Sequence, residues 1–161
     1  MNHYDENKIS LCPVKPCHED FLFRLFIESR PDLALISGLD EHQKSSIIYQ
    51  QFIMEEQQLR IIYPEADFNI VMIDSEPIGR LFVYHGEKTD RIIEIALLEN
   101  YRGIGIGTKL MSTVIEEAMK YEKSITLQVG WFNEKAYKFY EKLGFKIVEN
   151  KGVSLEMKFA N

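Results

Sequence analysis

The sequence lacks the long apolar run that a membrane-spanning helix requires. No stretch of the 161 residues approaches the ~20 consecutive apolar residues of a bilayer span. The first ten residues, MNHYDENKIS, have neither the basic nor the apolar segment of a secretory signal. We therefore expect a cytoplasmic protein that makes no contact with a membrane.

An excess of positive charge is also missing. The chain has 19 Lys and Arg against 25 Asp and Glu, a net charge of −6. Proteins that bind nucleic acids or anionic membranes without sequence preference need a basic face. We therefore expect no nucleic-acid partner, whereas a cationic substrate is compatible with the acidic balance.

Cysteine is scarce, with Cys12 and Cys17 in the segment CPVKPCH. A zinc site here would recruit His18, but zinc needs about four ligands at set spacing and the sequence offers no second cluster. We therefore expect no metal site. The absence of an export signal favours reduced thiols.

What the chain does contain is ordinary for a folded protein. Apolar residues make up 45% and charged residues 27%, which is typical of globular domains and not of disordered chains. A length of 161 residues is enough for a substantial core but short for two domains. We expect residues 1–161 to form a single domain.

The N-terminal third predicts a strand followed by two helices. Residues 9–14 are β-leaning and end in prolines, and residues 18–29 carry apolar side chains at helical spacing up to Pro31. A second helix should begin near Asp40, because Asp40 and Gln43 have the spacing of a capping box.

After Pro64 the pattern changes to strands. Residues 68–73 and 78–84 flank strong turn residues and predict an antiparallel hairpin. Residues 91–98 and 124–129 read as buried strands on either side of a helix at 105–120, so this pair should be parallel. The predicted inner face of that helix comprises Leu110, Met111, Val114, Ile115, Ala118 and Met119.

The C-terminal part predicts one more helix and two strands. Asn133 can cap a helix that ends at Gly144, and strands follow at 145–148 and 153–159. The fold class is therefore α/β (α+β), with a mixed, mostly antiparallel sheet of about seven strands flanked by four helices.

The most informative segment is IIEIALLENYRGIGIGTK, residues 92–109. A strand leads into a loop with glycines at 103, 105 and 107, and a helix follows at once. Glycines let backbone approach a ligand, and free N–H groups at a helix start bind anions. The spacing fits neither a Walker A loop nor a GxGxxG dinucleotide fingerprint. A phosphate-bearing ligand of another kind is expected.

Two motifs resemble those of the GNAT superfamily of acetyltransferases. Arg102-x-x-Gly105-x-Gly107 is similar to the family's pyrophosphate loop. The segment NEKAYKFYEKLGF, residues 133–145, resembles its later motif, Asn-x-x-Ala-x-x-x-Tyr-x-x-x-Gly-Phe. The resemblance extends over about residues 68–159, whereas residues 9–66 match only in the order of their elements.

The resemblance implies acetyl-CoA as the co-substrate. Backbone amides of the loop would bind its pyrophosphate, and the pantetheine arm would lie like an extra strand where residues 91–98 bulge and splay from residues 124–129. The implied binding residues are Ala96, Leu97, Leu98, Arg102, Gly103, Ile104, Gly105, Ile106, Gly107, Thr108, Asn133 and Tyr140. Within this set, the Leu97 N–H would polarise the thioester carbonyl, and Arg102 would add a charge-assisted contact.

The resemblance also implies two catalytic residues. Glu94 lies where the family often has an acidic residue and would take a proton from the amine; the alternatives are a solvated carboxylate or an ion pair with Arg91 or Arg80. Tyr140 matches the tyrosine that points at the sulfur and would donate a proton to the departing thiolate; the alternative is a packed aromatic side chain.

The acceptor is expected to be a primary amine of a small molecule. A protein N-terminus or lysine, and an acyl-CoA-binding sensor without turnover, stay as alternatives, and a homodimer is suggested by family habit alone. The acceptor should bind where the two N-terminal helices and residues 149–152 meet the splayed strands. Phe26, Arg80, Phe82 and Tyr84 are candidates to contribute there. Trp131 and Phe132 are expected to pack at the end of the sheet; the alternative is that they line the acceptor pocket.

Overall fold

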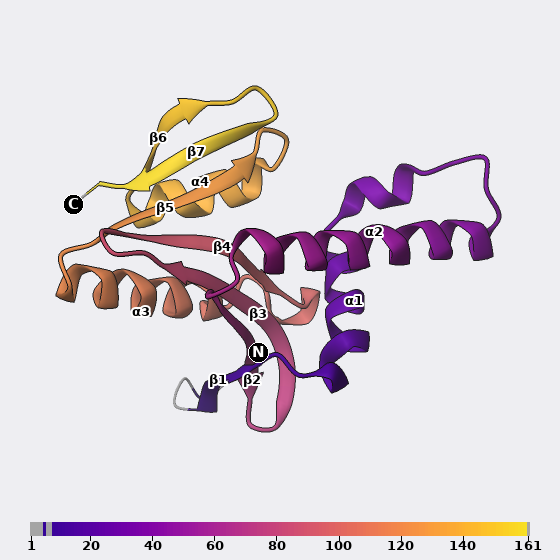
Figure 1. Cartoon of the computed structure of the whole chain (residues 1–161), viewed down its shortest axis with the longest axis horizontal. Helices are drawn as coiled ribbons and strands as arrows, with labels where there is room; N and C mark the ends of the chain where they lie inside the picture. The colour runs from indigo at the N-terminus through magenta and orange to yellow at the C-terminus, as the bar shows by residue number, and fades with distance from the viewer. Residues whose placement is uncertain (1–4, 6–7, 161) are drawn as a thin grey trace.

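The computed structural model describes residue 5 and residues 8–160 and contains a mixed seven-stranded sheet with the order β1-β2-β3-β4-β5-β7-β6. The strands are β1 (Ile9–Pro13), β2 (Asp67–Ile73), β3 (Glu76–His85), β4 (Thr89–Leu97), β5 (Ser124–Gly130), β6 (Phe145–Asn150) and β7 (Ser154–Phe159). The α-helices are α1 (Glu19–Glu28), α2 (Glu41–Ile62), α3 (Ile106–Lys120) and α4 (Glu134–Leu143). This architecture confirms the predicted fold class (Figure 1). The prediction that no secretory signal precedes the fold concerns residues 1–10, of which 1–4 and 6–7 lie outside the described residues.

The predicted hairpin forms as β2 and β3, which pair antiparallel around a tight turn. Asp74 occupies this turn with a φ of 54°, a left-handed conformation that aspartate tolerates better than most residues. β1 pairs antiparallel with β2 and forms one edge of the described sheet. An edge strand tolerates Pro13, because a proline without an N–H removes no hydrogen bond to a neighbouring strand on the outer side.

A bulge in β4 changes which face of the sheet its side chains point to. Phe82 pairs with Glu94, but the next residue, Val83, pairs with Ile92, so Ile93 is an extra residue in β4. The bulge resets the alternation of side chains. As a result Ile92 and Ile95 pack with the core around α3 and α4, whereas Ile93 packs with the core under α1 and α2.

The parallel pairing of β4 with β5 is short. It extends from Thr89 with Ser124 to Ile92 with Leu127 and stops at the bulge, although β4 continues to Leu97. The two strands therefore separate beyond Ile92, as the sequence resemblance implied. Their separated ends lie beside the start of α3.

The helices cover both faces of the sheet. One cluster packs α1 and α2 against β2 and β3 through Phe26, Phe52 and Phe82, and two others pack α3 and α4 against the opposite face. In Figure 1, α1 and α2 lie to the right of the central strands and α3 lies below them to the left. The predicted inner face of α3 is right except for Met119, which is 50% exposed. Each residue turns a helix by about 100°, so a residue next to the fully buried Ala118 points away from the sheet.

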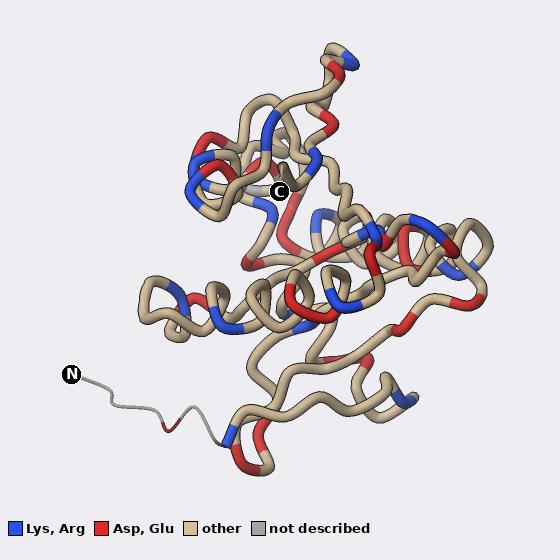
Figure 2. The backbone as a smooth tube through the Cα atoms, turned by 90° about the vertical axis from the view of Figure 1, so that its left-hand side faces the viewer, with Lys and Arg blue, Asp and Glu red and all other residues tan. Residues whose placement is uncertain are grey.

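The surface carries charges of both signs along the helices (Figure 2). Among the described residues, no helix is long and apolar enough to cross a membrane.

Candidate functional site

The N-terminus of α3 is held open by glycine. Gly105 is its N-cap residue with a φ of 93°, and Gly103 has a φ of 75°, both in the left-handed region that glycine enters without a Cβ penalty. The N-cap position therefore supplies no side-chain hydrogen bond to the helix, and residues 106–108 of its first turn include no acidic residue. Because the first amides of a helix have no intrahelical acceptor, those of Ile106, Gly107 and Thr108 are available to an anion.

Arg102 is placed differently from the expectation. Its Nε donates to the carbonyl oxygen of Leu97 at 2.8 Å and its Nη2 to that of Glu28 at 3.2 Å, while its backbone N–H donates to the carbonyl oxygen of Glu99 at 3.2 Å. The guanidinium therefore ties the loop to the end of β4 and to the end of α1. Its charge-assisted contact with a phosphate stays a prediction, and in this arrangement the free amides lie after Arg102 in the chain.

The backbone at the end of β4 alternates between two directions. The N–H of Leu98 donates to the carbonyl oxygen of Ile78 at 2.8 Å, and the pairing of Ala96 with Arg80 continues the same ladder. The N–H and C=O of one strand residue point to the same side, and successive residues alternate between the two sides. Both groups of Leu97 therefore point away from β3, toward the gap beside β5. Of the three residues predicted to meet the pantetheine, Leu97 therefore has the backbone that faces the gap.

Glu94 is drawn into an ion pair, one of the two alternatives to a base. Its Oε1 accepts from Arg80 Nη2 at 2.6 Å, and Arg80 Nη1 donates to Glu56 of α2 at 2.7 Å. The Glu94 side chain is 32% exposed, so part of the carboxylate remains accessible to solvent. The other pairing considered, with Arg91, does not form, because Arg91 pairs with Glu156 instead.

Arg80 lies at the centre of this network with only 3% of its side chain exposed. Burial lowers its pKa, but the attraction of Glu94 and of Glu56 outweighs burial and holds the pKa above the ordinary value. A guanidinium that is buried between two carboxylates in good geometry is stabilised only while both partners are present. Glu56 has no counterpart in the sequence motifs, and two adjacent glutamates, Glu55 and Glu56, within a helix gave no signal that could have found it.

Tyr140 lies on the buried face of α4. Its ring contacts Phe139 and Phe145 at centroid distances of 5.4 and 6.0 Å. Burial, and secondarily the negative charge of Glu94, raises the pKa of Tyr140 to about 12. The influence of Glu94 on this phenol means that the structure brings the two predicted catalytic residues close enough to interact electrostatically. The phenol is therefore protonated at neutral pH.

The segment before α4 fulfils one expectation and contradicts another. The Asn133 side chain accepts from the Ala136 N–H at 3.2 Å, so the predicted N-cap is confirmed. Trp131 and Phe132 do not pack at the end of the sheet but are 66% and 63% exposed, with their rings in edge contact at 6.1 Å. They follow β5 directly, at the same end of the sheet as the separated strands.

The side chains suggested for the acceptor region divide into core and surface. Phe26 of α1 and Phe82 of β3 are buried in the core between the sheet and the helices α1 and α2. The Tyr84 ring contacts the Tyr63 ring in a tilted arrangement, with 5.6 Å between the ring centroids, beside a small depression at the end of α2. That depression has a volume of about 240 Å³ and is lined by Ile62, Tyr63, Pro64, Glu65 and Tyr84. The sequence had not singled out its α2 residues.

Cys12 and Cys17 are both free thiols, the first half-buried and the second exposed. Within the described part of the chain, no group of three or more His, Cys, Asp or Glu residues is placed to hold a metal ion. The groups brought together at the site are backbone amides, the Tyr140 phenol and the Arg80–carboxylate network.

Comparisons with known sequences support the resemblance. Residues 22–145 match the sequence model of the Acetyltransferase (GNAT) family. The chain is 34% identical over 116 residues to the uncharacterized N-acetyltransferase CgeE of Bacillus subtilis, covering 63% of this chain and 43% of that protein. It is 33% identical over 100 residues to an N-alpha-acetyltransferase of Sulfurisphaera tokodaii, covering 53% and 59%. The chain thus spans about half the length of these curated relatives.

Comparison with solved structures shows the same fold. The PaiA N-acetyltransferase of Thermoplasma acidophilum, crystallised with coenzyme A, superposes with a TM-score of 0.71 at 21% identity, covering 95% of this chain and 99% of that one. The family match extends over most of the chain and includes both the glycine loop and the α4 segment. The chain therefore belongs to the GNAT family of acetyltransferases.

Proposed function

We propose that this protein transfers the acetyl group of acetyl-CoA directly to a primary amine. The observation that carries the proposal is the uncapped N-terminus of α3 beside the point where β4 and β5 separate. An open helix N-terminus suits a pyrophosphate, and an unpaired strand edge suits an extended amide-containing chain such as pantetheine. Family membership supports the same reaction.

The residues after Arg102 fit the pyrophosphate of acetyl-CoA. The amides of Ile106, Gly107 and Thr108 would bind it, and the absence of side chains at Gly103 and Gly105 leaves the approach clear. Ile104, between these glycines, would contribute backbone to the same loop. When bound, acetyl-CoA supplies an activated thioester. The Leu97 N–H, which faces the gap, would then donate to the thioester carbonyl oxygen and stabilise the charge that develops there.

Glu94 is proposed to accept a proton from the incoming ammonium group, directly or through a water molecule. A lysine-like amine has a pKa near 10 and must lose this proton before its lone pair can attack. One oxygen of Glu94 is held by Arg80, which fixes the direction of the carboxylate while leaving it partly exposed. The network through Arg80 to Glu56 thus positions the base from α2.

Tyr140 is proposed to stabilise the departing sulfur. A thiol has a pKa of about 8.5, whereas burial first and the charge of Glu94 second raise the pKa of Tyr140 to about 12. The proton therefore rests more stably on the phenol than on the sulfur. We infer that Tyr140 acts mainly as a hydrogen-bond donor to the thiolate as the C–S bond breaks and the new C–N bond forms.

The acceptor is proposed to be a primary amine of a small molecule. A protein N-terminus is the second candidate, because the Sulfurisphaera tokodaii relative is an N-alpha-acetyltransferase. The exposed Trp131 and Phe132 next to the strand ends offer apolar surface that a peptide could contact. A binder without turnover is disfavoured by the presence of both a carboxylate and a phenol at the site.

The experiment that tests this function measures release of free thiol from acetyl-CoA in the presence of two panels of acceptors. One panel contains small primary amines, including polyamines and amino-acid amides; the other contains short peptides with free N-termini. Thiol release that depends on a small amine supports the proposal, and release with peptides alone identifies the second candidate. Binding of acetyl-CoA with no release across both panels would contradict an enzymatic function.

The base assignment has its own matched pair of variants. Glu94→Gln keeps a hydrogen-bond acceptor for Arg80 but removes the proton acceptor, so turnover should fall about 100-fold while acetyl-CoA affinity is kept. Glu56→Gln removes a carboxylate from the same guanidinium without touching the strand. If both variants lower turnover equally, Glu94 acts only as a structural partner of Arg80.

A further inference from the structure

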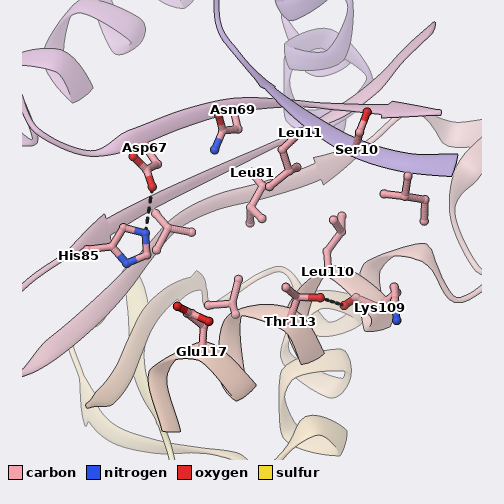
Figure 3. A pocket seen from close by; sticks show the side chains of 13 residues that line it. Ser10, Leu11, Asp67, Asn69, Leu81, His85, Lys109, Leu110, Thr113 and Glu117 are labelled. Carbon is pink, nitrogen blue, oxygen red and sulfur yellow. Dashed lines mark hydrogen bonds and ion pairs between the residues drawn. The ribbon is translucent and has the colours of Figure 1, made fainter. Parts of the chain in front are cut away.

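A second cavity lies on the opposite side of the sheet from the Arg80 network. It has a volume of about 460 Å³ and opens between α3 and the first three strands (Figure 3). Its lining residues are Ile9, Ser10, Leu11, Asp67, Asn69, Leu81, Val83, His85, Lys109, Leu110, Thr113, Val114 and Glu117. None of them belongs to the proposed transfer site. The volume is in the range of pockets that hold small organic ligands.

The walls of this cavity are mainly apolar. Leu81 and Val83 of β3 face Leu110 of α3, and all three are buried members of one hydrophobic cluster. Leu11 of the edge strand is 45% exposed and completes the wall. Val71 of β2 belongs to the same cluster and Ile9 of β1 packs against it, so this apolar surface extends from β3 toward β1. The cavity beside it leaves room for an apolar ligand body.

The polar groups are distributed unequally along the cavity. Asp67 of β2 and Glu117 of α3 lie at one end, and Lys109 lies at the other (Figure 3). Lys109 and Glu117 are eight residues apart, so they are separated by about 12 Å along the helix axis. The cavity is thus elongated, with two carboxylates at one end and one ammonium group at the other.

His85 contacts two aspartates at the acidic end of the cavity. Its Nε2 lies 3.0 Å from Asp67 Oδ2, and its Nδ1 lies 3.3 Å from Oδ1 of the buried Asp90. Asp90 is also 3.3 Å from Lys123 Nζ, which offsets its charge. The Asp67 side chain is 60% exposed and can accept a further hydrogen bond from a ligand. Two carboxylates near an apolar cavity attract a cation more strongly than either would alone.

We propose that this cavity is a second small-molecule site, which binds an elongated amphipathic amine. The ammonium group of the ligand lies between Asp67 and Glu117, and its apolar chain lies along Leu81, Val83 and Leu110. The site is separate from the acceptor site, so its ligand is bound and not acetylated there. The proposal does not depend on the transferase activity.

The test uses 4-phenylbutylamine as the probe, with 4-phenylbutanol and 4-phenylbutyrate as controls of the same length. Backbone amide shifts of the wild-type chain are followed by NMR in the absence of acetyl-CoA. The proposal predicts saturable shifts at cavity residues such as Leu81, Leu110 and Thr113. The amine should bind at least fivefold more tightly than the alcohol, and the carboxylate should bind most weakly.

Two neighbouring glutamates on α3 provide the matched variants. Glu117→Gln should weaken the amine about fivefold and leave the alcohol unchanged, whereas Glu116→Gln, which is exposed but does not line the cavity, should change neither. Thr113→Trp places a bulky ring at an exposed lining position and should abolish binding of all three probes.

Three results would overturn the proposal. One is equal affinity for the amine and the carboxylate, which would reduce the cavity to a nonspecific apolar surface. Another is a shift pattern confined to residues around Glu94 or Tyr140. The third is the absence of saturable binding, which would mean that the cavity is covered by the chain itself or by a second copy. If Thr113→Trp fails to fold, the two glutamate variants still decide the question.

Discussion

The helices α3 and α4 both follow a strand of the separated pair, yet they begin in opposite ways. α3 starts at Gly105 with no capping side chain and no acidic residue in its first turn. α4 starts at Asn133, whose side chain satisfies the Ala136 amide, and has Glu134 in its first turn. α4 is stabilised by its own residues, whereas α3 keeps free amides and a positive dipole end for a ligand.

The two helices thus divide the work of the site. The start of α3 supplies backbone for an anion, and the interior of α4 supplies the Tyr140 phenol. A helix N-terminus is therefore informative when it has neither a capping side chain nor an acidic first turn. α1 also lacks a capping side chain, but Glu19 and Asp20 lie in its first turn. The Asp40 capping box of α2 follows the same rule as Asn133.

The largest effect on acetyl-CoA binding is expected when a side chain blocks the N-terminus of α3. Gly105→Val places a β-branched residue at a φ of 93° and a side chain where the phosphate approaches. We expect acetyl-CoA affinity to fall at least 100-fold by calorimetry. Gly38→Val is the control, since Gly38 has a φ of 82° and a Cβ at this position would meet no atom within 4 Å, so it carries the same strain far from the loop. Equal affinities in both variants and wild type would remove the loop from the binding site.

Tyr140→Phe tests whether α4 contributes to turnover and not to acetyl-CoA binding. This variant keeps the buried ring but removes the donor to the sulfur, so kcat should fall about 30- to 100-fold with acetyl-CoA affinity changed less than threefold. Burial first and Glu94 second raise the pKa of Tyr140 to about 12, so this phenol should cause no loss of wild-type kcat between neutrality and about pH 10. Unchanged kcat in the variant would assign Tyr140 to packing alone.

A subtler change gives α3 the acidic first turn of α4. Thr108 is exposed, and Thr108→Glu places a carboxylate among the free amides. The carboxylate should raise the free energy of unfolding by about 0.3–1 kcal/mol through the helix dipole. It should also weaken acetyl-CoA binding about tenfold by repelling phosphate. Stability is measured by denaturant unfolding and affinity by calorimetry; a change of the same sign in both would contradict the comparison.

The smallest effect is expected when the cap of α4 is removed. Asn133→Ala leaves the Ala136 amide without its acceptor and should lower the free energy of unfolding by about 1 kcal/mol. Acetyl-CoA affinity should fall about threefold, because the resemblance also implies a contact between Asn133 and pantetheine. Loss of stability with fully retained affinity would limit Asn133 to capping.

The sequence was sufficient to predict those features that depend on interactions between neighbouring residues in the chain. The Asp40 capping box, the turn at Asp74, the left-handed Gly144 and the glycine loop each depend on a few consecutive residues. The structure confirms the capping box, the turn, the left-handed Gly144 and the fold class, and it shows the glycine loop leading directly into α3; phosphate binding by that loop stays a prediction.

The sequence was insufficient where distant segments meet. Arg80 pairs with Glu56, 24 residues away, and Arg102 donates to the Glu28 carbonyl oxygen, 74 residues away. No local sequence pattern predicts either contact. The exposure of Trp131 and Phe132 likewise depends on which elements pack beside the end of β5. Such features follow from packing between elements, which the periodicity of one element does not contain.

The central claim is tested most directly by calorimetric titration of the wild-type chain with acetyl-CoA, alongside Gly105→Val. We predict saturable one-to-one binding by the wild type that is lost in the variant and weakens as salt rises, because the ligand is an anion. The absence of saturable binding to the wild type, or equal binding to both chains, would contradict the claim.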